Sequence, residues 1–176
     1  MSTIAENSFK TSPLETREFR NALGAFSTGV TIITALDQQG EKVGMTVNSF
    51  SSVSLEPALI LWSIDRSASC FSEFIAANHY AVHVLSAEQK DLSNLFASRD
   101  SDQFAELACD KGIADLPLLP DYSACFQCAA ELQYDGGDHI ILVGRVLAFC
   151  DRGTAPLLYY RCLLYTSPSP RDFEAS

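Results

Sequence analysis

The stretch Gly44–Phe71, GMTVNSFSSVSLEPALILWSIDRSASCF, joins a hydroxyl-rich segment, an apolar run and the start of a helical pattern. The apolar run 58–62 is short and dense, which predicts a strand buried on both faces. Pro57 precedes it and lacks the N–H that a sheet ladder needs. The small polar residues at the beginning of the stretch are Thr46, Asn48, Ser49, Ser51, Ser52 and Ser54.

Two interpretations of this stretch are open from the residues alone. Asp65-Arg-Ser-Ala-Ser69 stands just before a helical pattern at Phe71, Phe74 and Ile75. Because helix starts present free N–H groups, the hydroxyls and Arg66 suit an anionic ligand lying on a sheet. Ser and Thr hydroxyls also bond to nearby backbone groups, so the same residues are typical of an ordinary polar loop.

Composition narrows the class of protein. The chain has 176 residues, 47% of them hydrophobic, which predicts one globular domain. A formal net charge of -10 argues against a nucleic-acid-binding surface. The first 20 residues carry no apolar block, and no apolar run approaches the ~20 residues that cross a membrane, so we expect no membrane association. Without an export signal the six cysteines are expected to be reduced thiols, and the location cytoplasmic.

The N-terminal half predicts an arm, a helix and a hairpin. Residues 1–15 show no periodicity and are expected to be a flexible arm. Thr16 is a candidate cap for a helix with an apolar stripe from Phe19 to Phe26, ended by Gly29. The β-branched run 30–36, the turn Asp37–Gly40 and the run 42–49 then predict a hairpin.

The remainder of the chain predicts more strands than helices. The clearest signal is a hairpin of the runs 124–134 and 139–149 around Asp135-Gly-Gly-Asp138. Roughly six strands with short helices favour a mainly β, antiparallel barrel over a doubly wound sheet. The other expected elements are a helix over 69–78, a strand over 80–85, a helix from the capping box Ser86–Gln89 to Ala97, and an irregular segment over 98–123 with one short helix near 104–108.

Several chemically distinctive residues have an ordinary structural explanation. Cys125 and Cys128 lack a second pair and would point to opposite faces of a strand, so we expect strand cysteines and no metal site. His79 and His83 are four residues apart, as metal ligands on a helix would be. The surrounding pattern is strand-like, however, so we expect no metal site there. His139 opens a strand, where it could face a ligand or cap the hairpin. The segment 156–161 sets two tyrosines beside an arginine, which suits a nucleotide or a terminal strand equally.

Taken in order, five segments resemble the flavin reductase-like family, the flavin-binding split barrels that serve two-component flavin monooxygenases. The resemblance covers about residues 19–161, and each segment is weak by itself. The segments are FSTGVTIIT at 26–34, GMTVNSF at 44–50, SVSLEP at 52–57, DGGDH at 135–139 and PLLYYR at 156–161.

The resemblance implies a homodimeric, six-stranded antiparallel split β-barrel of Greek-key type over 16–161. It implies non-covalent binding of FMN or FAD, oxidation of NADH or NADPH, and transfer of reduced flavin to a partner monooxygenase. By position, His139 becomes the catalytic residue that meets the nicotinamide nucleotide, without serving as an obligatory base. The implied cofactor-binding residues are Gly44, Met45, Thr46, Asn48, Ser49, Ser63, Ile64, Asp65, Ser69, Cys70, Leu95, Phe96, Tyr159, Tyr160 and Arg161.

Two points stand apart from this resemblance. The tail 162–176, which follows Arg161 with CLLYTSPSPRD, departs from the family's usual ending and is similar to translated sequencing-adaptor read-through; residues beyond about Leu164 are expected to pack poorly and to have no function. The alternative functions are a flavin-binding barrel without reductase activity, acting as carrier or sensor, and a small barrel for another apolar ligand.

Overall fold

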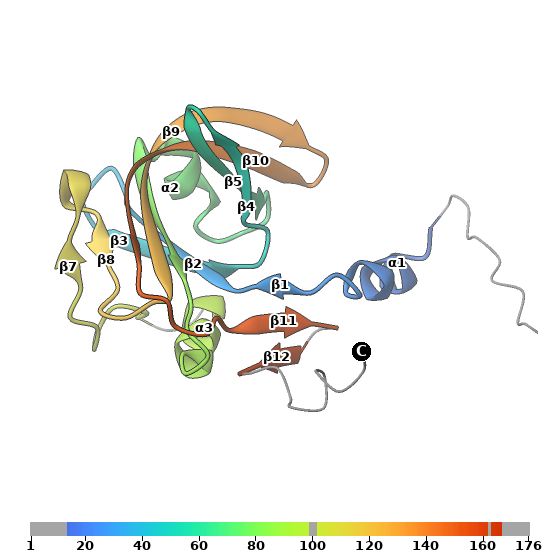
Figure 1. Cartoon of the computed structure of the whole chain (residues 1–176). Helices are drawn as coiled ribbons and strands as arrows, with labels where there is room; N and C mark the ends of the chain where they lie inside the picture. Colours follow the sequence, from blue (N-terminus) through green and yellow to red (C-terminus); the bar gives the residue numbers. More distant parts are fainter. Residues whose placement is uncertain (1–13, 99–101, 162, 167–176) are drawn as a thin grey trace, which may run out of the picture.

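A seven-stranded sheet forms the body of the molecule in the computed structural model, which describes residues 14–98, 102–161 and 163–166 (Figure 1). Every pair of neighbouring strands in it is antiparallel. The expected mainly β, antiparallel split barrel is confirmed, with seven strands in place of roughly six. In spatial order they are β3 (Lys42–Val47), β2 (Thr31–Leu36), β6 (His79–Val84), β9 (Ala124–Gly136), β10 (His139–Asp151), β5 (Ala58–Asp65) and β4 (Ser51–Leu55).

The predicted long hairpin is confirmed as β9 and β10, of 13 residues each. Gly137 lies in the turn with φ +76°, a conformation that glycine adopts without strain. Register shifts near Gly144 and Ala148 bend the pair around the core. A Cβ on Gly144 would lie 2.1 Å from the Tyr80 hydroxyl, so the absence of a side chain there lets β10 pass over the buried tyrosine.

The core is organised around Trp62 on β5. Its indole is fully buried and packs edge-to-face on Phe74 and Tyr80, with ring centroids 5.2 and 5.7 Å apart. Along β5 buried residues alternate with partly exposed ones, and only Ile60, Trp62 and Ile64 are buried. The expectation that the run 58–62 is buried on both faces was therefore wrong, because an antiparallel sheet can leave its second face open.

Four helical segments accompany the sheet in the part of the chain that the structure describes. The predicted helix at 69–78 is confirmed in a shorter form, with Phe74 buried. The expected helix near 104–108 is absent from the described residues, which form turns at 103–106 instead. The segments are α1 (Thr16–Leu23), α2 (Phe71–Ala76), α3 (Lys90–Ala97) and the 3₁₀ helix η1 (Ile113–Asp115).

The boundaries of α1 and α3 differ from the prediction. Helix α1 ends at Leu23 and not at Gly29, because Thr28 and Gly29 are drawn into a strand pairing. Helix α3 begins at Lys90, four residues after Ser86. Ser86 instead forms a β-bridge with Pro156. Half of the expected capping box survives, since the Ser86 N–H donates to Gln89 Oε1 at 2.8 Å.

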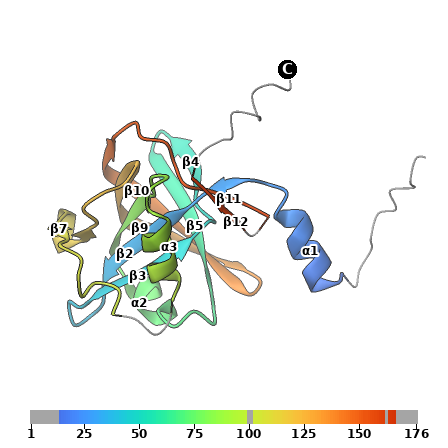
Figure 2. The ribbon, with the colours of Figure 1, turned by 90° about the horizontal axis from the view of Figure 1, so that it is seen from below.

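Helix α1 buries none of its residues and lies away from the barrel in both views (Figures 1 and 2). No helix in the described part of the chain is long and apolar enough to cross a membrane. Most of the predicted arm and tail lies outside the described residues.

Two small sheets complete the described part of the fold. The first has three strands, β1 (Thr28–Gly29), β11 (Leu158–Tyr160) and β12 (Leu163–Tyr165). The second pairs β7 (Asp110–Lys111) with β8 (Pro117–Leu118).

Candidate functional site

Two adjoining cavities lie along β3 and α3. Thr46 and Ala97 line both, and their volumes are about 250 and 330 Å³. The first cavity continues to the loop after β5 and is lined by Gly44, Met45, Thr46, Asp65, Ser67, Ala68, Ser69, Cys70, Phe96, Ala97, Ser98 and Gln103. The second reaches β11 and β12 and is lined by Val30, Thr46, Val47, Asn48, Ser93, Asn94, Ala97, Tyr159 and Leu164.

Close contact between β3 and α3 forms the shared wall of the cavities. The Thr46 hydroxyl donates to the Ser93 carbonyl at 2.7 Å, which ties the strand to the helix. A Cβ on Gly44 would lie 2.4 Å from the Phe96 ring, far inside van der Waals contact. Glycine at position 44 therefore lets the Phe96 ring lie flush against the strand, where it forms part of the cavity wall.

The lining mixes polar and apolar surface and carries little charge. Neither cavity has a lysine or arginine among its described lining residues, and Asp65 is the one acid. Asp65 Oδ1 accepts the Ser67 N–H at 2.7 Å, which stabilises the loop. Burial raises the pKa of the Cys70 thiol, so that Cys70 is a neutral group 3.8 Å from the Met45 sulfur. Any phosphate in these cavities has to be held by hydroxyl, amide and backbone N–H donors.

Nine of the sequence-predicted residues line the cavities. Gly44, Met45, Thr46, Asp65, Ser69, Cys70 and Phe96 surround the first, and Asn48 and Tyr159 join Thr46 at the second. They come from β3 and the residue after it, the end of β5 and the loop that follows, α3 and β11, so segments up to 115 residues apart in sequence (Gly44 to Tyr159) meet here.

Six other predicted residues line neither cavity. Ser49 and Ser63 bond to each other, with Ser63 N–H to Ser49 Oγ at 2.9 Å. The Ile64 side chain is fully buried in the core. Leu95 packs, half-buried, in the apolar cluster beneath α3. Tyr160 and Arg161 contact each other, since Arg161 Nε donates to the Tyr160 hydroxyl at 3.0 Å.

His139 begins β10 one strand away from the first cavity. It pairs in register with Asp65, which lines that cavity. Its Nδ1 lies 2.7 Å from an Asp138 carboxylate oxygen, and its side chain is 41% exposed. Arg66 does not line the cavity, in contrast to the anion-binding role that the sequence suggested. Its guanidinium pairs with Asp135.

Several lining residues were missed by sequence reasoning. Ser67 and Ala68 belong to a segment that was singled out, but without a role for each residue. Ser98 and Gln103 lie in a segment that was classed as irregular, and no local pattern marks them. The remainder are Val30, Val47, Ser93, Asn94, Ala97 and Leu164, the last of which is placed by the pairing of β12 with β11.

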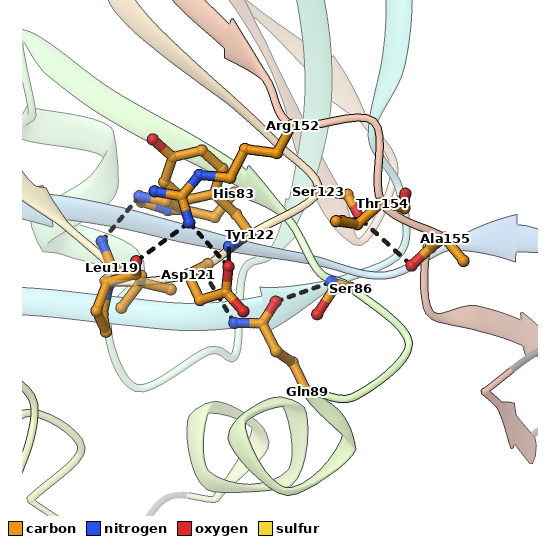
Figure 3. Close-up of polar contacts among 11 residues, drawn as sticks. His83, Ser86, Gln89, Leu119, Asp121, Tyr122, Ser123, Arg152, Thr154 and Ala155 are labelled. Atoms are coloured by element: carbon orange, nitrogen blue, oxygen red, sulfur yellow. Dashed lines mark hydrogen bonds and ion pairs between the residues drawn. The ribbon is translucent and has the colours of Figure 1, made fainter.

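A polar network links the start of α3 to the chain segments before β9 and β11 (Figure 3). Gln89, at the start of α3, accepts the Ser86 N–H and donates to the Asp121 carbonyl, both at 2.8 Å. Arg152 pairs with the Asp121 carboxylate at 2.8 Å and covers the Tyr122 ring. Ser123 Oγ lies 2.9 Å from the Thr154 hydroxyl, which fixes the chain that leads to β11.

The other candidate residues have structural surroundings. His83 is fully buried on β6, where Nε2 accepts the Leu119 N–H and Nδ1 faces the Ile32 carbonyl, each at 3.2 Å. Burial lowers the pKa of His83 to about 4. Cys125 and Cys128 are buried strand residues in different apolar clusters, as predicted. Burial raises the pKa of each thiol to about 12.

Comparison with known families gives one model that matches residues 23–166, described as the flavin reductase like domain. Among curated proteins, the chain is 47% identical over 143 residues to FMN reductase (NADH) SmoA of Agrobacterium fabrum, covering 81% of each chain. It is 45% identical over 150 residues to the reductase component of flavin-dependent trigonelline monooxygenase from Acinetobacter baylyi. That match covers 85% of this chain and 48% of the relative, so the chain spans about half of that protein's length.

Solved structures agree with this similarity. The NADH:FAD oxidoreductase of Streptomyces globisporus, solved in complex with NAD and FAD fragments, superposes with a TM-score of 0.84. The two chains are 31% identical, and the match covers 93% of this chain and 99% of the other.

Proposed function

The chain belongs to the flavin reductase-like domain family, and from this premise we propose that it is an NAD(P)H-dependent flavin reductase using FMN or FAD. The observation that carries the proposal is the pair of adjoining cavities, lined by hydroxyl, amide, sulfur and aromatic groups. Sites of this size with a few convergent polar groups are typical of cofactor binding. Names of relatives support the choice, since they include an FMN reductase (NADH) and an NADH:FAD oxidoreductase.

The residues present fit a flavin. When bound, a flavin accepts a hydride directly from the nicotinamide, so the protein needs no covalent nucleophile. Gly44 lets the Phe96 ring pack against β3 as part of the cavity wall, and the loop 67–70 supplies hydroxyl and backbone donors. Backbone amides just past the end of β3, at Asn48 and Ser49, are our candidates for stabilising negative charge. Tyr159 offers a ring for stacking, and His139 positions the nicotinamide nucleotide.

The test is NADH oxidation without flavin, with FMN and with FAD, repeated with NADPH. We expect oxidation that requires flavin and saturates with it. Gly44→Val is the matched inactive variant, because its branched side chain overlaps the Phe96 ring. Retention of flavin through gel filtration without NADH oxidation would instead establish the alternative, a flavin-binding carrier or sensor. Failure to bind either flavin would contradict both and leave a barrel for another apolar ligand.

We propose further that the reduced flavin passes to a separate flavin-dependent monooxygenase. Relatives named as reductase components of monooxygenases support this role. A flavin-dependent monooxygenase on the far side of a dialysis membrane should then turn over when this chain, NADH and flavin are supplied on the near side. No turnover even when both proteins share one compartment would contradict the proposal.

We also propose a homodimer in the cytoplasm. The apolar stripe of α1 supports the dimer, because Phe19 and Leu23 are 49% and 59% exposed and Phe26, just beyond, is 77% exposed. Exposed apolar patches of this kind often mark interfaces between proteins. Sedimentation should give a dimer for the wild type and a monomer for Phe26→Asp. A monomeric wild type would contradict the proposal.

A further inference from the structure

Arg66 joins the loop of the first cavity to the turn that precedes His139. Its two neighbours in the chain, Asp65 and Ser67, both line the cavity. Its own side chain does not, and it extends across to the β9–β10 turn. There the guanidinium pairs with the Asp135 carboxylate, and Nε donates to the Gly137 carbonyl at 3.3 Å.

The Arg66 backbone makes a third contact with the same turn. Its N–H donates to the Asp138 carbonyl at 3.0 Å, one residue before His139. In the strand ladder the next pair along is Asp65 with His139. Three of the four residues of the turn 135–138 are therefore held by Arg66. The planar guanidinium is suited to this, because it presents several donors in a fixed geometry.

An arginine on the hairpin itself, Arg145, provides a comparison. Arg145 of β10 pairs with Glu131 of β9, and its side chain is 45% exposed, the same fraction as that of Arg66. The Arg145 pair lies within the hairpin, and neither partner forms a hydrogen bond or ion pair with a described residue that lines either cavity. Exposed ion pairs of this kind contribute little to folding stability. The two arginines differ chiefly in what they connect.

We propose that Arg66 is a positioning residue, which fastens the turn 135–138 and with it His139 to the cavity loop and so fixes where the nicotinamide nucleotide binds. This inference rests on the proposed reductase function. Arg66 acts through His139 and the turn and has no contact with the flavin. The arginine that the sequence suggested as an anion ligand thus acts in the placement of the nicotinamide nucleotide.

The experiment compares Arg66→Met, Arg66→Lys and the control Arg145→Met in the full chain. We expect Arg66→Met to raise the KM for NADH about tenfold, an effect that loosening a positioning contact produces. The flavin dissociation constant of Arg66→Met, measured by quenching of flavin fluorescence, should stay within about twofold of the wild-type value. Its thermal midpoint should also stay close to that of the wild type, because an exposed ion pair contributes little to stability. Arg66→Lys should give a KM for NADH between those of the wild type and Arg66→Met, because lysine keeps the charge but lacks the planar guanidinium. Arg145→Met should leave all three values unchanged.

A double-mutant cycle with Asp135→Asn tests whether Arg66 acts through its ion pair with Asp135. Because both substitutions remove the same pair, we expect the double variant to resemble Arg66→Met alone. Equal loss of flavin and NADH binding in Arg66→Met would overturn the inference, as would no change in either. The imidazole NMR signals of His139 provide a readout that needs no turnover. They should shift in Arg66→Met and not in Arg145→Met, and unchanged signals would overturn the inference even if the chain proves to be no reductase.

Discussion

His83 and His139 lie in the same sheet, but their surroundings are opposite in kind. His83 is fully buried, and both ring nitrogens meet backbone groups: Nδ1 lies near the Ile32 carbonyl, and Nε2 accepts the Leu119 N–H (the latter shown in Figure 3). His139 opens β10 with a side chain that is 41% exposed. Its Nδ1 meets the carboxylate of its neighbour Asp138, and its other nitrogen has no hydrogen-bond partner among the described residues.

The difference separates a residue that stabilises the fold from one that is free to meet a ligand. In the His83 region the polar network joins β6, α3 and the chain leading to β11, and it holds the frame of the cavities. In the His139 region the contacts are exposed and cost little to break. Substitutions should therefore affect stability at one site and substrate binding at the other.

The largest effect is expected from His83→Ala. The change leaves the Leu119 N–H without its acceptor in a buried place and opens a cavity, which together should lower the free energy of unfolding by about 3–5 kcal/mol. Urea unfolding followed by circular dichroism measures it. A loss within about 0.5 kcal/mol, the range of ordinary surface substitutions, would contradict a stabilising role for His83.

The next effect concerns pH. Burial lowers the pKa of His83 from 6.5 to about 4, so between these values the unfolded chain binds a proton that the folded chain does not. The neutral His83 imidazole therefore contributes fully to the free energy of unfolding above pH 6.5. This contribution, about 3 kcal/mol in all, is lost as the pH falls towards 4.

His83→Gln isolates this contribution, because an amide keeps a donor and an acceptor and does not titrate. Between pH 7 and pH 5 the free energy of unfolding should fall less steeply in His83→Gln than in the wild type. Equal slopes in wild type and His83→Gln would contradict the assignment of a buried neutral imidazole.

The smallest effect on stability is expected from His139→Ala, within about 0.5 kcal/mol. Its effect should appear in binding, with the KM for the nicotinamide nucleotide raised more than the flavin dissociation constant. Steady-state kinetics and flavin titration of the same preparation measure both. An equal rise in the KM for the nicotinamide nucleotide and in the flavin dissociation constant would contradict the proposal that His139 contacts the nicotinamide nucleotide.

Local patterns predicted much of this molecule and misplaced some boundaries. The β9–β10 hairpin followed from two strand-like runs around Asp-Gly-Gly-Asp, because turn chemistry and alternation act over a few residues. The end of α1 and the start of α3 were misplaced, since Gly29 and Ser86 pair with β11 and Pro156 from the far end of the chain. Such pairings leave no mark in the local sequence.

By itself, the sequence determined the class of fold, the hairpin, and the segments around Gly44 and Asp65 that meet at the cavities. Only the tertiary structure decided which side chains line them, and that Arg66 reaches the turn before His139 while His83 is enclosed. The physical reason is that propensity and periodicity act between neighbours in sequence. Burial and hydrogen-bond partners, by contrast, are set by segments that meet only when the sheet has closed.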